Sequence, residues 1–295
     1  MKNSTGSLVV VLILGAALFL ASHFLSERPP GQEFQEFREL QTPYSWDLLN
    51  SVLWIQTAAE RRALTAQIYR QAKRMLDAAL EDPEWTAALE QGEGASKLPP
   101  AIILDVDETV LDNSAYQAQL ILENTRFETP TWHEWCRKEN ALPIPGALEF
   151  TQYAAERGVE VMYLTNRRHE VEEATRNNLE RHGFPLNKEV DTLYTRGERE
   201  EWDVSDKSSR RADIASRYRV LLLFGDDLND FVSGTRSSLA ERDAIVGEYD
   251  EYWGSRWFVL PNPEYGGWEG ALSGFQRDLS PAERLEAKLD ALRLP

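Results

Sequence analysis

Short apolar runs alternate with amphipathic stretches through most of the chain after residue 100. The apolar runs have the length of buried parallel strands, and they lie at residues 101–104, 159–164, 192–194, 220–224 and 256–260. The stretches between them indicate helices at residues 146–157, 168–182 and 207–218, and Gly158 and Gly183 are typical helix stops. This alternation predicts an α/β fold with a parallel sheet and helices on both faces of the sheet.

Three further regions surround or interrupt this core. Apolar residues recur at spacings of three and four within residues 46–82, which predicts one long helix or two helices before the first strand. Residues 116–140 are rich in aromatic side chains, so we expect a small cap over the edge of the sheet. The last segment opens with Ser280, Pro281 and Glu283, a pattern typical of a helix N-terminus.

The N-terminus carries a different signal. Lys2 precedes an apolar run at residues 8–21, which is about as long as the core of a signal peptide and a little short for a full membrane span. Phe19 stands two positions before Ala21 where an A-x-A cleavage site needs a small residue, which favours an uncleaved anchor. Either outcome carries the rest of the chain across a membrane. We therefore expect an exported protein of the periplasm or cell envelope, attached to the membrane if the leader is retained.

The expected organisation follows from these patterns. A signal peptide or membrane anchor occupies residues 1–25, and a linker with the helical N-terminal region occupies residues 26–98. The catalytic core covers residues 99–275 with its cap insertion at about 114–142. The C-terminal helix lies within residues 276–295.

Composition excludes some functions. A net charge of −17 would repel phosphate backbones, so we expect no nucleic-acid polymer as a partner. Any small phosphorylated substrate requires cations concentrated at its site. The one cysteine, Cys136, cannot form an intramolecular disulfide. A homo-oligomer remains open.

The chemistry centres on residues 101–113, which read AIILDVDETVLDN. Asp105 and Asp107 follow the first apolar run, at the carboxyl end of a predicted strand, where open α/β sheets bind ligands. Two such close carboxylates repel each other unless a cation holds them, which points to a hard metal and above all to Mg²⁺. A calcium loop does not fit, because Val110 stands where glycine is needed and Tyr116 where a bidentate Glu is needed.

Other polar residues follow the later strands or begin a helix. They are Thr165, Asn166, Arg167, Lys207, Asp226 and Asp230. The carboxyl ends of parallel strands share one edge of the sheet, so we expect these side chains to converge with Asp105 and Asp107 on a single site.

These segments resemble a known family. DVDET, the Thr of YLTNR, the Lys of DKSSR and GDDLND are similar to the four motifs of the haloacid dehalogenase superfamily of aspartyl-nucleophile phosphatases. LWIQTAAERRAL, DVDETVLDNSAY, PGALEF, YLTNR, GDDLNDF and PNPEYGGWEGAL narrow the resemblance, over about residues 46–273, to the class C acid phosphatases, the bacterial surface lipoprotein phosphatase and 5′-nucleotidase family. The resemblance implies a Rossmann-like core with a small cap, four catalytic aspartates, Mg²⁺ and export. The chain departs from these lipoproteins in having no cysteine near its N-terminus for lipid attachment.

The resemblance also suggests roles for the acidic residues. Asp105 would attack the phosphorus of a phosphomonoester, and Asp107 would protonate the leaving oxygen and later deprotonate the attacking water. Mg²⁺ would be held by Asp105, the backbone carbonyl of Asp107 and Asp226, with Asp230 orienting the metal shell.

The remaining candidates would bind the rest of the substrate. Thr165 and Lys207 are expected to bind phosphoryl oxygens, with Asn166 beside them, while Arg167 either binds phosphate or forms an ion pair within the fold. Tyr116, Trp132 and Tyr265 are candidates for stacking on a nucleobase, an interaction worth about 1–3 kcal/mol per base. For Tyr116 and Trp132 the alternative is packing inside the cap.

The sequence therefore predicts a Mg²⁺-dependent acid phosphatase that acts on small phosphomonoesters, above all nucleoside 5′-monophosphates. Three alternatives stay open: a phosphatase or phosphotransferase for non-nucleotide esters, a catalytically silent binding protein, and an envelope scaffold whose helical N-terminal region binds a partner.

Overall fold

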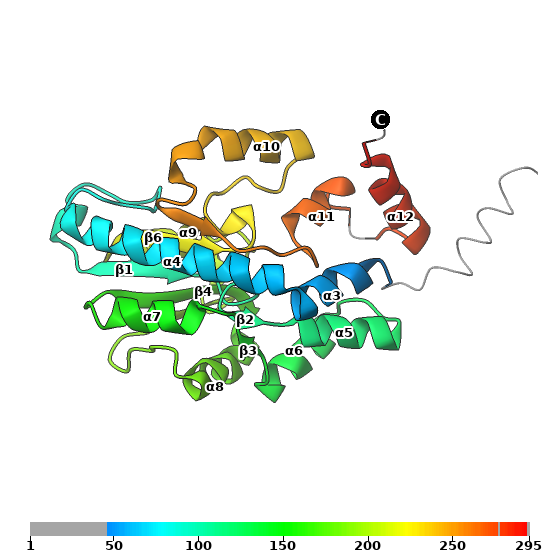
Figure 1. Cartoon of the computed structure of the whole chain (residues 1–295), viewed down its shortest axis with the longest axis horizontal. Helices are drawn as coiled ribbons and strands as arrows, with labels where there is room; N and C mark the ends of the chain where they lie inside the picture. Colours follow the sequence, from blue (N-terminus) through cyan, green and yellow to red (C-terminus); the bar gives the residue numbers. More distant parts are fainter. Residues whose placement is uncertain (1–45, 277, 294–295) are drawn as a thin grey trace, which may run out of the picture.

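The computed structural model describes residues 46–276 and 278–293, and within them a parallel sheet forms the centre of the molecule (Figure 1). The strand order is β5-β4-β1-β6-β7, and every neighbouring pair is parallel. The strands are β1 (Pro100–Leu104), β4 (Glu160–Arg168), β5 (Leu193–Arg196), β6 (Arg219–Gly225) and β7 (Trp257–Val259). The parallel α/β sheet predicted from the sequence is confirmed, and β1 occupies its middle.

The strands are apolar on both faces, as a sheet covered by helices requires. Every residue of β6 is buried, as are four of the five residues of β1. β4 is longer than the apolar run that predicted it and includes Thr165, Asn166 and Arg167, which were expected to follow the strand. Pairing with β5 shifts register between Leu164 and Arg168, so this polar end departs from regular pairing.

Two apolar clusters lie on the two faces of the sheet. One joins the sheet to α4 (Ala59–Glu81), α7 (Ala147–Ala155) and α8 (Glu172–His182), through residues such as Leu76, Phe150 and Leu179. The other includes Ile214 of α9 (Ser208–Ala215) with Trp257. Helices therefore cover both faces, as the sequence predicts.

The helical region before the sheet consists of two helices, α3 (Leu49–Thr57) and α4, after a short 3-10 turn, η1 (Trp46–Leu48). The extended backbone of Ala58, with ψ of 123°, separates them. On α4 the buried Tyr69 packs against Phe150 and Phe224, and its hydroxyl donates a 2.7 Å hydrogen bond to the carbonyl of Thr109. α4 thereby holds the loop that follows β1.

Two helices, α5 (Ser114–Glu123) and α6 (Thr129–Lys138), make up the insertion between β1 and α7. They lie at the same end of the molecule as α3 (Figure 1). A two-stranded antiparallel ribbon of β2 (Leu111–Asp112) and β3 (Leu142–Pro143) joins the start and end of the insertion. The sequence analysis does not identify these strands, because two residues carry no readable alternation.

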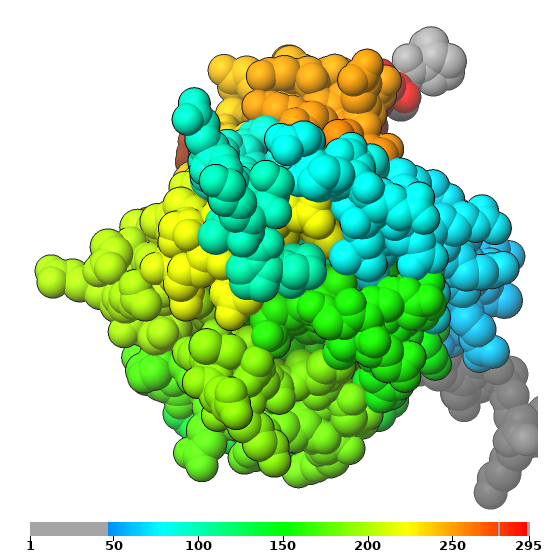
Figure 2. Space-filling model, turned by 90° about the vertical axis from the view of Figure 1, so that its left-hand side faces the viewer, coloured from blue at the N-terminus to red at the C-terminus, as the bar shows by residue number. Residues whose placement is uncertain are grey.

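The end of the molecule at which the strands begin is covered by the segment before β1. Figure 2 shows this end, where that segment lies on the surface next to the region of α9. Gln91 from this segment donates hydrogen bonds to the carbonyls of Ala215 and Tyr218. The carboxyl end of the sheet is thus the end left for a site.

After β6, the described residues add three helices and two 3-10 turns. They are η5 (Leu228–Asp230), α10 (Leu239–Glu248), η6 (Asp250–Tyr252), α11 (Gly267–Leu272) and α12 (Pro281–Asp290). α12 begins with the predicted capping box, in which Ser280 and Glu283 each accept from the other's backbone. α10 and α11 were not predicted.

The expected signal peptide or anchor at residues 1–25 and the linker up to residue 45 lie outside the described residues. Among residues 46–276 and 278–293, no helix is both long and apolar enough to cross a membrane.

Candidate active site

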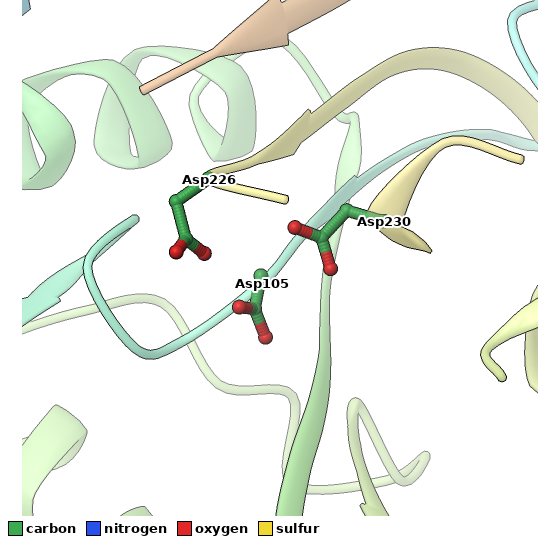
Figure 3. A group of neighbouring side chains, drawn as sticks. All are labelled: Asp105, Asp226 and Asp230. Carbon is green, nitrogen blue, oxygen red and sulfur yellow. The ribbon is translucent and has the colours of Figure 1, made fainter. Parts of the chain in front are cut away.

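Three carboxylates meet at the carboxyl end of the sheet. Asp105 follows β1, Asp226 follows β6, and Asp230 ends η5. Each offers an oxygen that lies within 4.8 Å of the others. Figure 3 shows Asp226 and Asp230 extending toward Asp105. The predicted convergence of these three residues is therefore present in the fold.

The tight turn after β6 places Asp230. A Cβ on Gly225 would lie 2.1 Å from Oδ2 of Asp230, so only glycine lets the strand pass this side chain. Asp227 caps η5 by accepting from the amide of Asn229, and Asp230 Oδ2 accepts from the amide of Asp227 at 2.9 Å. The side chain of Asp227 thereby stabilises the turn, while those of Asp226 and Asp230 form the cluster with Asp105.

Lys207 neutralises part of this charge. It stands at the start of α9, is 2% exposed, and its Nζ lies 2.6 Å from both Asp105 Oδ1 and Asp230 Oδ1. Burial alone lowers the pKa of Lys207, but its two carboxylate partners more than offset burial and raise that pKa. Lys207 therefore stays charged beside the expected phosphoryl position.

One lysine does not balance three carboxylates. Burial, opposed by Lys207 and reinforced by Asp230 and Asp107, raises the pKa of Asp105 to about 7. Burial, followed by repulsion from Asp230 and Asp105, raises the pKa of Asp226 well above its ordinary value. A bound cation would remove this repulsion, and clustered carboxylate oxygens are the donors that hard divalent cations prefer. The cluster therefore fits a divalent metal ion.

Asp107 lies beside the cluster with partners of its own. Its Oδ1 accepts from Arg167 Nε at 2.9 Å and from Asn113 Nδ2 at 2.9 Å, and Arg167 Nη2 lies 2.8 Å away. Among the described residues, the one hydrogen-bonding contact to its Oδ2 comes from Thr165 Oγ1, at 3.5 Å. Asp107 lines the cavity described below, so Oδ2 is the oxygen available to a substrate.

Thr165 and Arg167, at the polar end of β4, contact Asp107. Thr165 is fully buried, accepts from the amide of Arg167 at 3.0 Å, and is not among the described residues that line the cavity. Arg167 is 2% exposed and also contacts Thr175 and Asn113. Of the two roles expected for Arg167, the fold shows the ion pair, formed with Asp107, and Arg167 also lines the cavity.

Asn166 points to the other side of the same strand. Its side chain accepts from Arg210 at 2.7 Å and donates to the carbonyl of Ser205 at 3.0 Å, and it lines the cavity. Both ends of its amide are thus engaged by the protein.

A cavity of about 940 Å³ opens over the carboxylates. Trp132 of the cap and Tyr265 of the loop after β7 both line it. Tyr116 does not: it is 2% exposed, its ring packs 5.2 Å from that of Trp132, and its hydroxyl bonds Thr131 Oγ1 at 3.0 Å. The structure thus brings Trp132 and Tyr265 to the cavity. Tyr116 packs inside the cap, which was the alternative role expected for it.

The sequence analysis missed two residues in the PNPEYGG segment. Asn262 donates a 2.7 Å hydrogen bond to Asp226 Oδ2 and so orients this carboxylate. Glu264 is completely buried, lines the cavity, and has no hydrogen-bond partner for either carboxylate oxygen among the described residues. Both residues stand in a segment that carries the family resemblance, so the resemblance is the signal that could have found them, whereas residue type alone points to Tyr265 as a stacking ring.

The fold and site define a Rossmann-like α/β protein with an acidic centre at the end of its middle strand and a small helical cap above it. Residues 23–268 match the family described as HAD superfamily, subfamily IIIB (acid phosphatase). The chain belongs to this family, and the resemblance seen in its motifs is confirmed.

Solved structures of class C acid phosphatases are also similar to this chain. The class C acid phosphatase from Bacillus anthracis is 33% identical, with a TM-score of 0.75 over 86% of this chain and 99% of that one. A tungstate-bound structure of the class C acid phosphatase from Bacillus anthracis is 34% identical, with a TM-score of 0.74 over 84% and 97%.

Two plant proteins are more distantly similar. The stem 28 kDa glycoprotein of Glycine max is 25% identical over 164 residues, which is 55% of this chain and 58% of that protein. The stem 31 kDa glycoprotein of Glycine max is 25% identical over 162 residues, 55% and 50% of the two chains. The chain thus spans 58% and 50% of the lengths of these two curated relatives.

Proposed function

We propose that this protein is a Mg²⁺-dependent acid phosphatase that hydrolyses small phosphomonoesters through an aspartyl-phosphate on Asp105. One observation carries the proposal: Asp105 and Asp107 lie at the end of the same central strand, and both face the cavity. Asp105 belongs to the carboxylate cluster and is paired with Lys207, while Asp107 is held separately by Arg167. The two carboxylates thus have different surroundings, as two different chemical roles require.

In the first step, an Asp105 oxygen attacks phosphorus and the bond to the leaving oxygen breaks. Asp107 donates a proton to that oxygen, so the product leaves as a neutral alcohol. In the second step, water attacks the phosphorus of the aspartyl-phosphate and Asp107 accepts the proton from the water. Asp105 is then free again, and inorganic phosphate is released.

Cations make this attack feasible. Asp105, Asp226 and Asp230 with the backbone carbonyl of Asp107 would hold Mg²⁺, which when bound supplies positive charge beside the phosphoryl oxygens. Lys207, 2.6 Å from Asp105, offsets repulsion between this carboxylate and an anionic substrate. Tungstate, bound in the structure of the Bacillus anthracis relative, has the tetrahedral oxyanion shape of phosphate, which supports a phosphoryl site in this family.

We further propose nucleoside 5′-monophosphates as preferred substrates. Trp132 and Tyr265 both line the cavity, and flat aromatic rings bind any nucleobase by stacking. The cavity volume of about 940 Å³ lies within the range of small-molecule sites.

Export to the cell envelope is also proposed, from the apolar run at residues 8–21. The mass of the membrane-associated protein tests the anchor form. An intact N-terminus supports a retained anchor, and loss of about the first 25 residues shows a cleaved signal peptide.

The test of the enzymatic proposal is phosphate release from AMP and from p-nitrophenyl phosphate, with Mg²⁺ and with EDTA. We expect release that EDTA abolishes and that Asp105→Asn lacks. Asp243→Asn makes the same chemical change at an exposed position of α10 and should remain active. A folded wild-type protein that releases phosphate from neither ester in Mg²⁺ would instead support the binding-protein alternative.

A further inference from the structure

The C-terminal helix forms one wall of the cavity. Arg284, Ala287 and Lys288 of α12 line the same cavity as the carboxylates at the strand ends. Figure 1 shows α12 beside α11, on the side of the molecule where α3 and the cap lie. The match to the family model ends at residue 268, before α12 begins.

One side chain ties this wall to the rest of the protein. The ammonium of Lys288 forms an ion pair with Asp47 of η1 and a second one, at 2.7 Å, with Glu269 of α11. Lys288 therefore connects three elements that border the cavity: the beginning of the helical N-terminal region, the helix after the PNPEYGG segment, and α12.

α12 packs against the rest of the protein through partly buried side chains. None of its residues is fully buried: Leu285 is half-buried and Leu289 is 41% exposed. The side chains of Lys288, Asp47 and Glu269 are 26%, 41% and 33% exposed to solvent. Water and salt therefore weaken both ion pairs. Helices with so few buried apolar contacts belong to the least stable parts of a fold and open locally.

We propose that α12 is a displaceable wall of the active-site cavity, latched by Lys288, and that it determines how large a leaving group the site accepts. The inference rests on the proposed phosphatase function and adds its substrate range. With α12 in place, the 940 Å³ cavity suits a nucleoside monophosphate or a smaller ester. Phosphate esters on peptides need the wall to move, because the chain on either side of the phosphorylated residue must leave the cavity.

The experiment compares the full-length protein with Lys288→Met, which keeps the length of the side chain and removes its charge. Lys288→Arg serves as the conservative variant, and Glu286→Gln is a matched control on an exposed position of the same helix. Two quantities are measured: amide hydrogen exchange in residues 278–293, and kcat/KM for p-nitrophenyl phosphate, AMP and a phosphoserine peptide.

We expect Lys288→Met to exchange about threefold to tenfold faster in α12, the effect of losing partly exposed ion pairs. Its kcat/KM for the phosphopeptide should rise by a similar factor while that for p-nitrophenyl phosphate stays within about twofold, since a change in α12 leaves the carboxylate cluster unaltered. Lys288→Arg and Glu286→Gln should behave like the wild type. Raised salt should also speed amide exchange in α12 of the wild type and raise its kcat/KM for the phosphopeptide, as Lys288→Met does.

Two results would overturn the inference. Unchanged exchange in Lys288→Met would show that Lys288 does not latch the helix. Faster exchange with an unchanged ratio of phosphopeptide to p-nitrophenyl phosphate turnover would show that α12 does not limit leaving-group size. Failure of the wild type to hydrolyse p-nitrophenyl phosphate is a separate result, which would refute the proposed function and leave the latch to be judged by exchange.

Discussion

The guanidinium of Arg167 grips the carboxylate of Asp107 with two nitrogens: Nε lies 2.9 Å and Nη2 2.8 Å from Oδ1. Arg167 is itself buried and extends over the ring of Trp132, with 5.4 Å between the guanidinium carbon and the ring centroid. The proposed proton donor and a cavity-lining aromatic of the cap thus share one buried cation. We therefore expect Arg167 to act through Asp107, as a positioning residue.

This relationship predicts the effect of Arg167→Lys. A lysine keeps the charge but cannot make the two-pronged contact, so Asp107 loses its orientation. We expect kcat/KM for AMP to fall about 10-fold to 100-fold, since general acid catalysis contributes about 10²–10⁴-fold. The loss of kcat/KM for p-nitrophenyl phosphate should be much smaller, because p-nitrophenolate leaves without a proton and kcat/KM does not include the later hydrolysis of the aspartyl-phosphate, in which Asp107 acts on both substrates.

The neighbouring Arg168 provides the control, because it is partly exposed and pairs with Asp203 at the surface. Arg168→Lys should leave both substrates nearly unaffected. Equal losses on the two substrates with a raised KM would instead assign Arg167 to phosphate binding.

Tyr265→Ala tests the stacking proposal. Removing a stacked ring costs about 1–3 kcal/mol, so KM for AMP should rise by about 5-fold to 150-fold. KM for p-nitrophenyl phosphate, which has no nucleobase, should change far less. Tyr116→Phe is the control, since Tyr116 is buried in the cap, and it should keep both KM values. A similar rise in KM for both substrates with Tyr265→Ala would contradict stacking.

Glu264 makes the stability of the protein depend on pH. Burial, followed by repulsion from Asp112 and partly opposed by Arg61, raises the pKa of Glu264 from 4.5 to about 7. Between these values the folded protein binds this proton and the unfolded chain does not, so this group lowers stability as pH rises. The loss is complete above about pH 7 and reaches at most about 3 kcal/mol.

Glu264→Gln removes the ionisation. In urea unfolding with EDTA, we expect this variant to be more stable than the wild type at pH 8 and nearly equal to it at pH 4. The exposed Glu248→Gln is the control and should show no such pH-dependent difference. A Glu264→Gln effect of the same size at both pH values would rule out the titration of Glu264 as its cause.

Gly225→Ala tests the packing that positions Asp230. The new Cβ would lie 2.1 Å from Oδ2 and 2.2 Å from Cβ of Asp230, so the turn after β6 must shift. We expect the Mg²⁺ concentration for half-maximal activity to rise at least about 10-fold, as for loss of groups that orient metal ligands. Gly247→Ala, on α10, has no atom within 4 Å of its new Cβ and should retain normal Mg²⁺ dependence. Unchanged Mg²⁺ dependence in Gly225→Ala would contradict the expectation that this packing positions Asp230 for metal binding.

Local patterns were enough to predict the sheet and the centre of the site. The apolar runs of β1 and β6 are continuous, and their polar ends carry Asp105 and Asp226, so topology alone brings these residues to one edge. The start of α12 was also readable, because a capping box is contained within four residues. Short elements such as β2 and β3 were not, since two residues carry no periodicity.

Side-chain partnerships between distant segments depended on the tertiary structure. From the sequence, Arg167 could either bind phosphate or form an ion pair. Its ion pair with Asp107 exists because the fold brings β4 close to the loop after β1. Tyr116 and Trp132 looked alike as cap aromatics, yet packing buried one and brought the other to the cavity. Lys288 and Asp47, 241 positions apart, meet because the two ends of the described chain fold over the same cavity. Periodicity and caps act between near neighbours, whereas burial and ion pairing depend on which segments the whole fold brings together.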